Sequence, residues 1–333
     1  MKRDLSTVRV TVAIPAYRGR RWIRRCLDSV LASTGIRLRV VVFDNASSDG
    51  TRDIVEREYP EVELIKSPRN VGFARANNRV IHRAISRGDD FAFLLNEDAR
   101  VDPDTIVGLV KVARDLDVAV LSPLQYNYEG TEFEADFSSL LRQAGLRKTS
   151  KTPDAAEGWM KSDFVPTIRI IGAAVLMRLS TLRRVGLFDP IYFLYAEEED
   201  LCRRVLRHGY KVGVTPKARI YHGHESTGDF MTLERMRRFN IIRGKYILVL
   251  KNAQQPLGRA MLSLFAMTAR DIRDLFVSHR LGLAWEFALA AVQVTSLLGR
   301  IRRRRKLERT LASELWTHRE MGTGNGSGEL LWR

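Results

Sequence analysis

The stretch FAFLLNEDARVDP, residues Phe91–Pro103, is the most informative part of this sequence. It opens with an unbroken run of apolar residues, the pattern of a strand that is covered on both faces. Asn96, Glu97 and Asp98 follow where such a strand leaves its sheet, and ligands of open α/β sheets bind at the carboxyl ends of the strands. An acidic residue there can hold a hard divalent cation, which can in turn hold a diphosphate. The alternative for Asp98 alone is a turn cap ahead of Pro103.

The sequence around this stretch alternates between strand and helix patterns. Further strands are expected at Val8–Ile14, Leu38–Phe43, Val62–Ile65 and Val118–Leu121, with helices at Trp22–Leu31, around Ile54 and Val55, at Val71–Ile85 and from Pro103. Strict alternation of this kind predicts an α/β fold with a parallel, doubly wound sheet and right-handed crossovers. Residues Tyr126–Pro166 are irregular and longer than a simple connection, which indicates a functional insertion.

The composition changes after residue 228. Met231–Leu250 is helical and basic, Leu257–Thr268 and Leu281–Leu298 are strongly apolar, and Arg300–Lys306 is almost wholly basic. We therefore expect an α/β domain over residues 1–228, a helical, basic extension over residues 229–310 and a flexible tail over residues 311–333.

Charge and cysteine content limit the partners and the compartment. The 333 residues include 55 Lys and Arg against 39 Asp and Glu, a formal charge of +16, which favours an anionic partner such as a nucleic acid, a phosphorylated substrate or an anionic membrane. The only cysteines, Cys26 and Cys202, both lie in helical patterns. A disulfide framework is not expected and a reducing cytoplasm fits. The N-terminus lacks the pattern of a secretory signal, so we expect the protein to stay in the compartment where it is made.

Polar residues also follow the second and third expected strands. Asp44 opens DNASSDGT at a strand end, where it can accept hydrogen bonds from a ribose or a base, while Asp49 is suited to cap the next helix. In SPRNVGFARANN, Gly72 lets the backbone approach a ligand and Arg69 can neutralise phosphate charge. The alternative for Asn70 is that it satisfies backbone groups of a turn.

Four carboxylates stand at the start of the helix predicted in YAEEEDLCRR, Tyr195–Arg204. Glu199 and Asp200 are explained by helix-dipole preference and by pairing with arginines four residues later. Glu197 and Glu198 remain near the turn, where like charges raise at least one carboxyl pKa and favour proton acceptance at neutral pH.

Two histidines follow the expected strand Ala218–Tyr221, in YHGHES. Either His222 or His224 can supply an imidazole to the cation proposed at Asp98. The alternative is a structural role, and a zinc site lacks matching cysteines.

Together these motifs resemble the family 2 glycosyltransferases, especially their bacterial rhamnosyltransferase-like branch. The resemblance covers about Val8–Gly228 and includes, in order, VAIPAY, DNASSDGT, RNVGFARANN, LLNEDARV, GAAVLMR and FDPIYFLYAEEEDLCRR. It implies a GT-A type fold, which is a Rossmann-like, mostly parallel doubly wound sheet, here with a C-terminal helical extension. It also implies a nucleotide-diphosphate sugar donor, Mg²⁺ or Mn²⁺, and inversion at the anomeric carbon.

The resemblance assigns roles to individual residues. Asp98 matches the metal-binding aspartate and His222 the later histidine. Relatives usually read Glu-Asp at the catalytic motif, with the aspartate as general base, whereas here Glu198 follows Glu197. Glu198 is therefore the candidate base and Glu197 the alternative. The donor-binding residues implied are Pro15, Ala16, Tyr17, Asp44, Arg69, Asn70, Gly72, Asn96, Glu97 and Gly172. Asn96 stands where many relatives have aspartate, which leaves less negative charge for the metal.

The implied activity is that of a metal-dependent inverting hexosyltransferase. It would move rhamnose or another hexose from a nucleotide-diphosphate donor to a hydroxyl of a glycan or polyprenyl-diphosphate-linked acceptor in cell-envelope polysaccharide synthesis. A non-catalytic membrane-associated or nucleotide-sugar-binding protein is the alternative. A sugar-nucleotide pyrophosphorylase or a Rossmann dehydrogenase would need a glycine-rich loop that AIPAYRGR lacks, and a nucleic-acid partner does not explain the acidic strand ends.

The C-terminal region is expected to meet the inner face of the cell membrane. Leu281–Leu298 has one charge, Glu286, and is bordered by basic residues, but its length is at the lower limit for a membrane crossing. An interfacial helix on anionic lipid, or a helical pair with Leu257–Thr268, is therefore predicted. The alternative is a helical subdomain or a homodimer interface that buries the same apolar face.

Overall fold

The structure, a computed structural model, describes residues 5–146, 158–223, 230–277 and 284–321. The chain forms two compact units, which we call the sheet unit (Met1–Phe188 with Leu201–Thr227) and the helical unit (Asp189–Asp200 with Gly228–Ser327). His224, the first three residues of Leu281–Leu298 and residues 322–333 of the expected tail lie outside the described residues.

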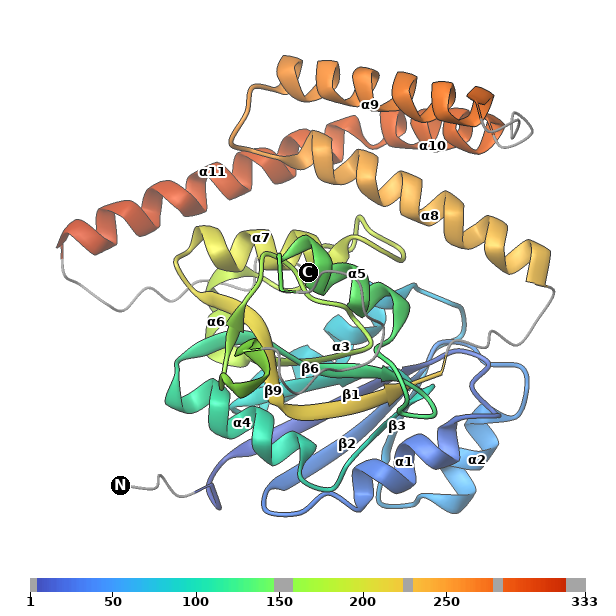
Figure 1. The fold of residues 1–333 in the computed structure, drawn as a ribbon, viewed down its shortest axis with the longest axis vertical. Helices are drawn as coiled ribbons and strands as arrows, with labels where there is room; N and C mark the ends of the chain where they lie inside the picture. The colour runs from blue at the N-terminus through green and yellow to red at the C-terminus, as the bar shows by residue number, and fades with distance from the viewer. Residues whose placement is uncertain (1–4, 147–157, 224–229, 278–283, 322–333) are drawn as a thin grey trace. The chain divides into compact units, whose positions relative to one another are not determined.

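One mixed sheet of nine strands runs through the described part of the sheet unit, in the order β3-β2-β1-β4-β8-β6-β9-β5, with β7 paired to β9 (Figure 1). The neighbours β3, β2, β1 and β4 are parallel, whereas β8 is antiparallel to both β4 and β6. The strands are β1 (Arg9–Ala16), β2 (Arg37–Asp44), β3 (Glu63–Lys66), β4 (Phe91–Leu95), β5 (Ala99–Val101), β6 (Val118–Asn127), β7 (Val165–Pro166), β8 (Ala174–Arg178) and β9 (Lys211–His222).

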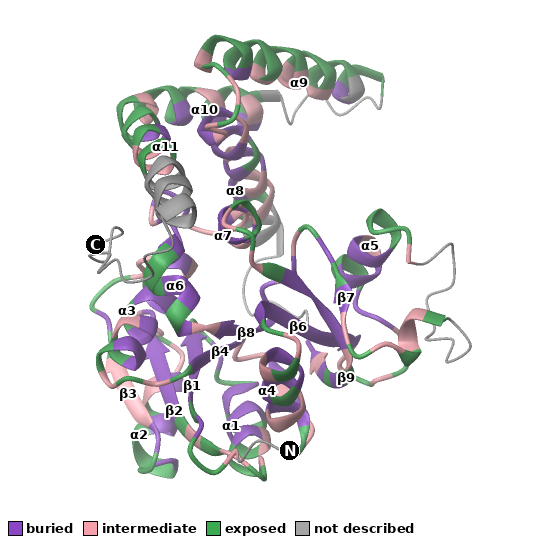
Figure 2. Cartoon of the chain, turned by 90° about the vertical axis from the view of Figure 1, so that its left-hand side faces the viewer, coloured by how far each residue is buried: buried purple, intermediate pink, exposed green. Residues whose placement is uncertain are grey.

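Helices cover both faces of this sheet because successive strand residues point to opposite sides. Val12 of β1 and Phe93 of β4 pack in the core that also contains residues of α1, α2 and α4. Their neighbours Ala13 and Leu94 pack in the core shared with α3, α6 and α7. The helices are α1 (Ile23–Leu31), α2 (Thr51–Glu58), α3 (Phe73–Ser86), α4 (Thr105–Asp115), α5 (Ala135–Gln143), α6 (Leu179–Val185) and α7 (Glu197–Arg207), with a 3₁₀ turn at Gly158–Lys161. Figure 2 shows the buried strands between these helices.

The doubly wound α/β sheet predicted from the strand and helix patterns is confirmed, with differences in its second half. The strand expected at Ala218–Tyr221 begins earlier, at Lys211, because VGVT is buried although a bulge and Pro216 interrupt the pattern. After the irregular stretch Tyr126–Pro166, the next long strand, β8, begins at Ala174. The antiparallel β8 and the short β5 were not predicted, since neither has an alternating pattern of its own.

The irregular stretch Tyr126–Pro166 contains a small core of its own in its described part. Glu134 caps α5 by accepting hydrogen bonds from the backbone of Asp136 and Phe137, at 3.0 and 2.7 Å. Phe137 packs with Leu124 and Val214 of the adjacent strands. The stretch is therefore an ordered addition to the sheet over its described residues.

The helical unit consists of α8 (Phe230–Lys251), α9 (Leu257–Val277), α10 (Ala284–Ser296) and α11 (Leu298–Met321), together with the segment 189–200. Ile191 and Tyr192 of that segment share a core with Tyr246 of α8 and Val294 of α10. Over the described residues, no helix has the length and apolar character required to cross a membrane. The helix α11 continues past residue 310, where the sequence predicted a tail, because ASELW contains strong helix formers.

Candidate active site

The carboxyl ends of β1, β2 and β3 lie side by side and are joined by backbone hydrogen bonds. Ala16 is in register with Asp44, and Asp44 with Lys66. Beyond the strand ends, the amide of Asn45 donates to the carbonyl of Ala16 at 2.8 Å, and the amide of Ser67 donates to the carbonyl of Asp44 at 2.9 Å. The donor-binding residues expected on three separate motifs therefore meet at one edge of the sheet.

Asp44 is fully buried at this edge and already has protein partners. Its Oδ2 atom accepts from Arg52 Nη2 at 2.6 Å, and its Oδ1 atom accepts from the amide of Ser47 at 3.2 Å. Charge-assisted bonds of this kind are shorter and stronger than those between neutral groups. Asp44 is thus tied to Arg52 of α2, a helix that the sequence did not connect to the site. Asp49 accepts from the amide of Thr51, the first residue of α2, at 3.1 Å, whereas the N-cap position of this helix is taken by Gly50.

The segment that follows β3 forms a tight turn ahead of α3. Asn70 Oδ1 accepts from the amide of Gly72 at 2.9 Å, a hydrogen bond within the turn. Gly72 has a φ of 83°, a conformation that favours glycine, and this explains the residue type at the start of α3. Asn45 ties the turn to β2, since its Oδ1 atom accepts from the amide of Val71 at 2.7 Å. Arg69 lies exposed on the turn.

Glu97 connects the end of β4 to the end of β1. Its Oε1 atom accepts from the amide of Tyr17 at 3.0 Å, while the Tyr17 side chain is 40% exposed. Gly19 makes room for Glu97, because a Cβ atom at residue 19 would lie 2.7 Å from Glu97 Cγ. Burial of the carboxyl group, followed by the charge of Asp98, raises the pKa of Glu97 to about 8. The buried Glu97 carboxyl group therefore holds its proton to a higher pH than an ordinary glutamate does.

Asp98 and His222 face each other at the same edge. Asp98 Oδ1 lies 3.2 Å from His222 Nε2, and Asn96 Nδ2 lies 3.4 Å from the same nitrogen. The amide of Gly223 donates to the carbonyl of Asp98 at 2.8 Å, and the amide of Asn96 donates to Ala173, next to the buried Gly172. In the ranges that the structure describes, no three His, Cys, Asp or Glu side chains gather around one point. The described residues thus bring the Asp98 carboxylate and the His222 imidazole together here.

Trp22 borders the Asp98–His222 pair, and sequence reasoning did not single it out. A Cβ atom on Gly223 would lie 2.7 Å from the Trp22 ring, so the ring covers the backbone that follows His222. The indole is 7% exposed, and its buried Nε1 atom has no hydrogen-bond acceptor among the described residues. The signal in the sequence is a tryptophan at the start of the first helix, which the helical spacing alone assigns to an apolar helix face.

The two candidate bases lie at the start of α7 and belong to the helical unit. Glu197 is 1% exposed, whereas Glu198 is partly exposed. Burial, followed by the charge of Glu198, raises the pKa of Glu197 well above its usual value. Glu197 Oε2 has no hydrogen-bond donor among the described residues. Of the two residues, Glu198 is therefore the one that is accessible to a molecule arriving from solvent.

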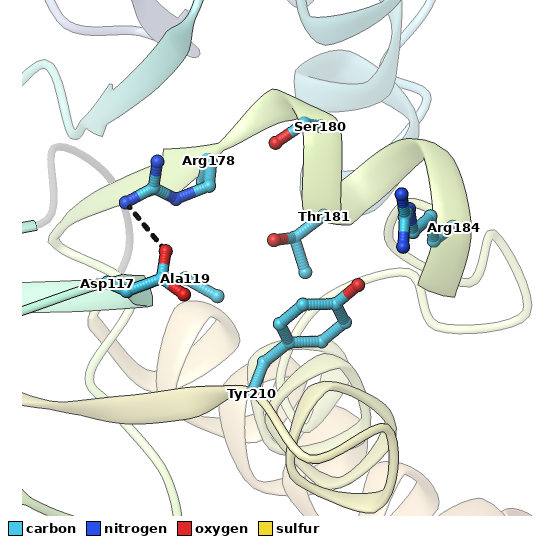
Figure 3. Close-up of a pocket in the computed structure, with 7 residues that line it drawn as sticks. All are labelled: Asp117, Ala119, Arg178, Ser180, Thr181, Arg184 and Tyr210. Carbon is cyan, nitrogen blue, oxygen red and sulfur yellow. Dashed lines mark ion pairs between the residues drawn. The ribbon is translucent and has the colours of Figure 1, made fainter. Parts of the chain in front are cut away.

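A separate pocket of about 240 Å³ contains none of these residues (Figure 3). It is lined by Asp117, Ala119, Arg178, Ser180, Thr181, Arg184 and Tyr210, and Arg178 pairs with Asp117 at 3.4 Å. Arg178 is in register with Phe91, the first residue of β4. The pocket therefore lies at the amino edge of the parallel strands, opposite the edge that carries Asp98, and we do not assign the reaction to it.

Comparison with known proteins agrees with this arrangement. The sequence of residues 11–179 matches the model of the family described as Glycosyl transferase family 2. The N-acetylglucosaminyl-diphospho-decaprenol L-rhamnosyltransferase of Mycobacterium tuberculosis is 29% identical over 225 residues, which cover 62% of this chain and 73% of that protein. The galactofuranosyltransferase GlfT1 of Mycolicibacterium smegmatis is 24% identical over 64% of this chain and 70% of its own length.

Solved structures share the fold. S. aureus TarS 1-349 in complex with UDP-GlcNAc superposes with a TM-score of 0.57 at 15% identity, covering 95% of this chain and 93% of that one. The mannosyltransferase PcManGT from Pyrobaculum calidifontis, in complex with GDP-Man and Mn²⁺, has a TM-score of 0.56 at 19% identity and covers 95% and 89%. The chain is therefore a member of glycosyltransferase family 2 with a GT-A fold.

Proposed function

We propose that this glycosyltransferase moves rhamnose or another hexose, with inversion, from a nucleotide-diphosphate donor to a hydroxyl of a polyprenyl-diphosphate-linked or glycan acceptor of the cell envelope. The observation that carries the proposal is the approach of Asp98 Oδ1 to His222 Nε2, at 3.2 Å, on the edge where β4 and β9 end. The names of the mycobacterial relatives support the sugar and the lipid-linked acceptor.

The donor is assigned to the carboxyl edge of the sheet. Its nucleoside would lie against Pro15, Ala16 and Tyr17, with the Asp44 carboxyl group accepting a hydrogen bond from the ribose or base. Arg69 and the backbone at Gly72 would face the diphosphate. The half-exposed Tyr17 ring supports this assignment, since an aromatic face that is open to solvent suits stacking with a base.

The Asp98 and His222 side chains fit a divalent cation that is shared with the donor. A carboxylate oxygen and an imidazole nitrogen that converge within 3.2 Å leave coordination positions for diphosphate oxygens and water. Asn96 adds a neutral amide, which keeps the site less negative than a pair of aspartates would. A bound Mg²⁺ or Mn²⁺ would offset the negative charge that develops on the leaving diphosphate.

Glu198 is the proposed general base. Its carboxylate takes the proton of the acceptor hydroxyl while that oxygen bonds to the anomeric carbon, and the bond from this carbon to the diphosphate oxygen breaks. Attack from the face opposite the diphosphate inverts the anomeric configuration. The partial exposure of Glu198 supports this choice, because an acceptor can reach it, whereas Glu197 is enclosed.

We also propose that the helical unit binds an anionic membrane surface through α9. Leu262, Phe265, Ile272 and Phe276, which we call the α9 apolar face, are spaced by three, seven and four residues, which places them on one side of the helix, and they are exposed by 71%, 74%, 42% and 65%. Figure 2 shows most of α9 as exposed. An apolar helix face of this size that no described residue covers indicates a docking surface.

Charge favours lipid over a second copy of the chain as the partner of this face. Arg259, Arg270 and Arg273 are exposed on the same helix. Two copies packed face to face would bring these arginines together, whereas anionic head groups would neutralise them. In α10, Glu286 is 2% exposed and accepts from Arg238 Nη2 at 3.3 Å. The carboxylate of this apolar helix is therefore paired with an arginine inside the helical unit.

Transfer assays with lipid-linked acceptors test the proposed activity. Purified protein is incubated with nucleotide-diphosphate sugars, Mn²⁺ and a short-chain N-acetylglucosaminyl-diphospho-polyprenol, and the product is identified by mass spectrometry. The anomeric configuration is read by NMR. A glycosylated acceptor with an inverted linkage is expected. Donor binding without transfer to any lipid-linked or glycan acceptor would contradict the proposal.

A further inference from the structure

The backbone directly before the candidate bases is held in an unfavourable conformation. Tyr195 has a φ of 67° and Ala196 a φ of 73°, so two consecutive residues with side chains adopt the left-handed region. Such residues persist only where the surrounding structure holds them, and they cluster at functional sites. The conformation of this turn sets where α7 begins and hence where Glu197 and Glu198 point.

Helix α8 touches this turn at Gly244. A Cβ atom on Gly244 would lie 2.8 Å from the carbonyl oxygen of Tyr195 and 2.9 Å from Ala196 Cβ. The neighbouring atoms are backbone and Cβ atoms, which cannot rotate away. Glycine in a helix interior is unfavourable compared with alanine, so close contact with the turn explains why α8 has a glycine here.

One buried ammonium group joins both ends of the segment that contains the turn. Lys251, the last residue of α8, is 2% exposed, and its Nζ atom lies 2.8 Å from Asp189 Oδ2 and 2.7 Å from Asp200 Oδ1. Glu308 Oε1 of α11 lies 3.3 Å from the same nitrogen. Buried charges require such partners, because removal of one leaves the others unpaired in a low-dielectric environment. Lys251 therefore fixes the two ends of residues 189–200 to α8.

A third contact lies between these two. Arg243 Nη2 donates to the carbonyl of Ile191 at 3.1 Å, and Tyr192 packs in the core with Tyr246. The segment 189–200 is thus bound to α8 at its start, its middle and its end, by charge, by hydrogen bonds and by backbone contact.

We infer that Gly244 and Lys251 of α8 are positioning residues for sugar transfer, which hold the Tyr195–Ala196 turn so that the carboxylate of α7 meets the acceptor hydroxyl. The inference rests on the proposed role of Glu198, with Glu197 as the alternative. In this view the helical extension is a part of the catalytic machinery as well as a surface for the membrane.

Gly244→Ala is the decisive variant, and Gly299→Ala is its matched control. Gly299 lies in α11, and a Cβ atom there would have no neighbour within 4 Å. Both substitutions add one methyl group to a helix, but only the first displaces the turn. For Gly244→Ala we expect kcat to fall about tenfold or more, the cost of a misplaced general base, with donor Kd unchanged. For Gly299→Ala we expect no change in kcat or donor Kd.

The measurements are made well below the thermal transition of each variant, so that loss of stability does not imitate loss of turnover. A Gly244→Ala enzyme that is less stable but has the kcat of the Gly299→Ala enzyme would overturn the inference. Lys251→Met gives a second test, with substitution of the exposed Lys306 by methionine as its control. We again expect kcat to fall in the Lys251→Met enzyme while its donor Kd stays unchanged.

Glu198→Gln and Glu197→Gln are measured in the same series. If Glu198→Gln or Glu197→Gln abolishes turnover while Gly244→Ala and Lys251→Met do not reduce it, the positioning inference alone is wrong. If both glutamine variants retain turnover, the proposed base is wrong and the positioning inference falls with it.

Discussion

His222 Nε2 and Asp98 Oδ1 lie 3.2 Å apart, although 124 positions separate the two residues in the sequence. The register of β5 with β9 brings them together, since Ala99 is paired with His222. The residue after Asp98 is thus the strand partner of the histidine. Pairing of these two strands holds both potential ligands on rigid backbone, which is the geometry that a shared cation and diphosphate require.

Asp98→Asn should lower kcat/KM for transfer by about a hundredfold or more, because a bound metal ion contributes several kcal/mol to transition-state stabilisation. Calorimetry should show that Mn²⁺ tightens binding of the nucleoside diphosphate to the wild type and not to the variant. Asp102→Asn is the control, since Asp102 pairs with Arg219 at 2.6 Å instead. Equal Mn²⁺ dependence in the wild type and Asp98→Asn would exclude Asp98 as a ligand.

Glu198→Gln should reduce kcat by about 10²- to 10⁴-fold and leave donor binding intact, the usual effect of removing a general base. Glu199→Gln, on the same helical turn, is the control. Rapid-quench measurement of a single turnover separates the chemical step from product release. If Glu197→Gln is the inactive variant and Glu198→Gln is active, the roles of the two residues are exchanged.

The ionisation of Glu197 should make folding stability fall as pH rises. In the folded protein, burial and then the charge of Glu198 raise the pKa of Glu197, and Asp200 adds to the effect. An unfolded glutamate has a pKa of about 4.3. Above the unfolded pKa, the unfolded chain has released a proton that the folded protein still holds, so stability decreases towards the folded pKa. Glu197→Gln removes this dependence. Its transition temperature relative to wild type should therefore increase from acid to neutral pH, as measured by scanning calorimetry, and a difference that is constant with pH would contradict the assignment.

Phe265→Asp should weaken binding to vesicles by about tenfold or more, because burial of one aromatic side chain contributes roughly 1.5–3 kcal/mol. The assay is flotation with vesicles that contain phosphatidylglycerol, at low and at high salt. Ser263→Asp adds the same charge at an exposed position of α9 outside its apolar face and is the control. Vesicle binding by wild type should decrease with salt, since the arginines of α9 contribute through their charge.

A dimer would give a different result in the same series. Wild-type protein that does not float with vesicles, and that sedimentation equilibrium shows to be a dimer dissociated by Phe265→Asp, would assign the α9 apolar face to a second copy of the chain.

The strands and helices of the first half of the sheet unit were predictable from local patterns. Val12 and Ala13 alternate between the two cores, and Phe91–Leu95 is apolar throughout because both faces are covered. Polar residues at strand ends, such as Asp44 and Asp98, were also predictable. The carboxyl ends of parallel strands lie at one edge of a sheet, where ligands bind. The antiparallel β8 was not predictable, because its apolar residues would suit either direction.

Local sequence patterns specified the periodicity of the helices and strands, the order of the motifs and the chemistry of the candidate residues. All three depend on side chains and spacings that are close together in the chain. The tertiary structure adds the contacts. It shows the strand pairing that brings Asp98 to His222, which the motifs had already grouped, and it joins Asp44 to Arg52 and Lys251 to Asp189 and Asp200, which no motif indicated. It also assigns Asp189–Asp200 to that unit, which the composition had placed in the catalytic domain. The physical reason is that packing and buried charge pairing act between residues that are distant in sequence, and no local pattern encodes which of them meet.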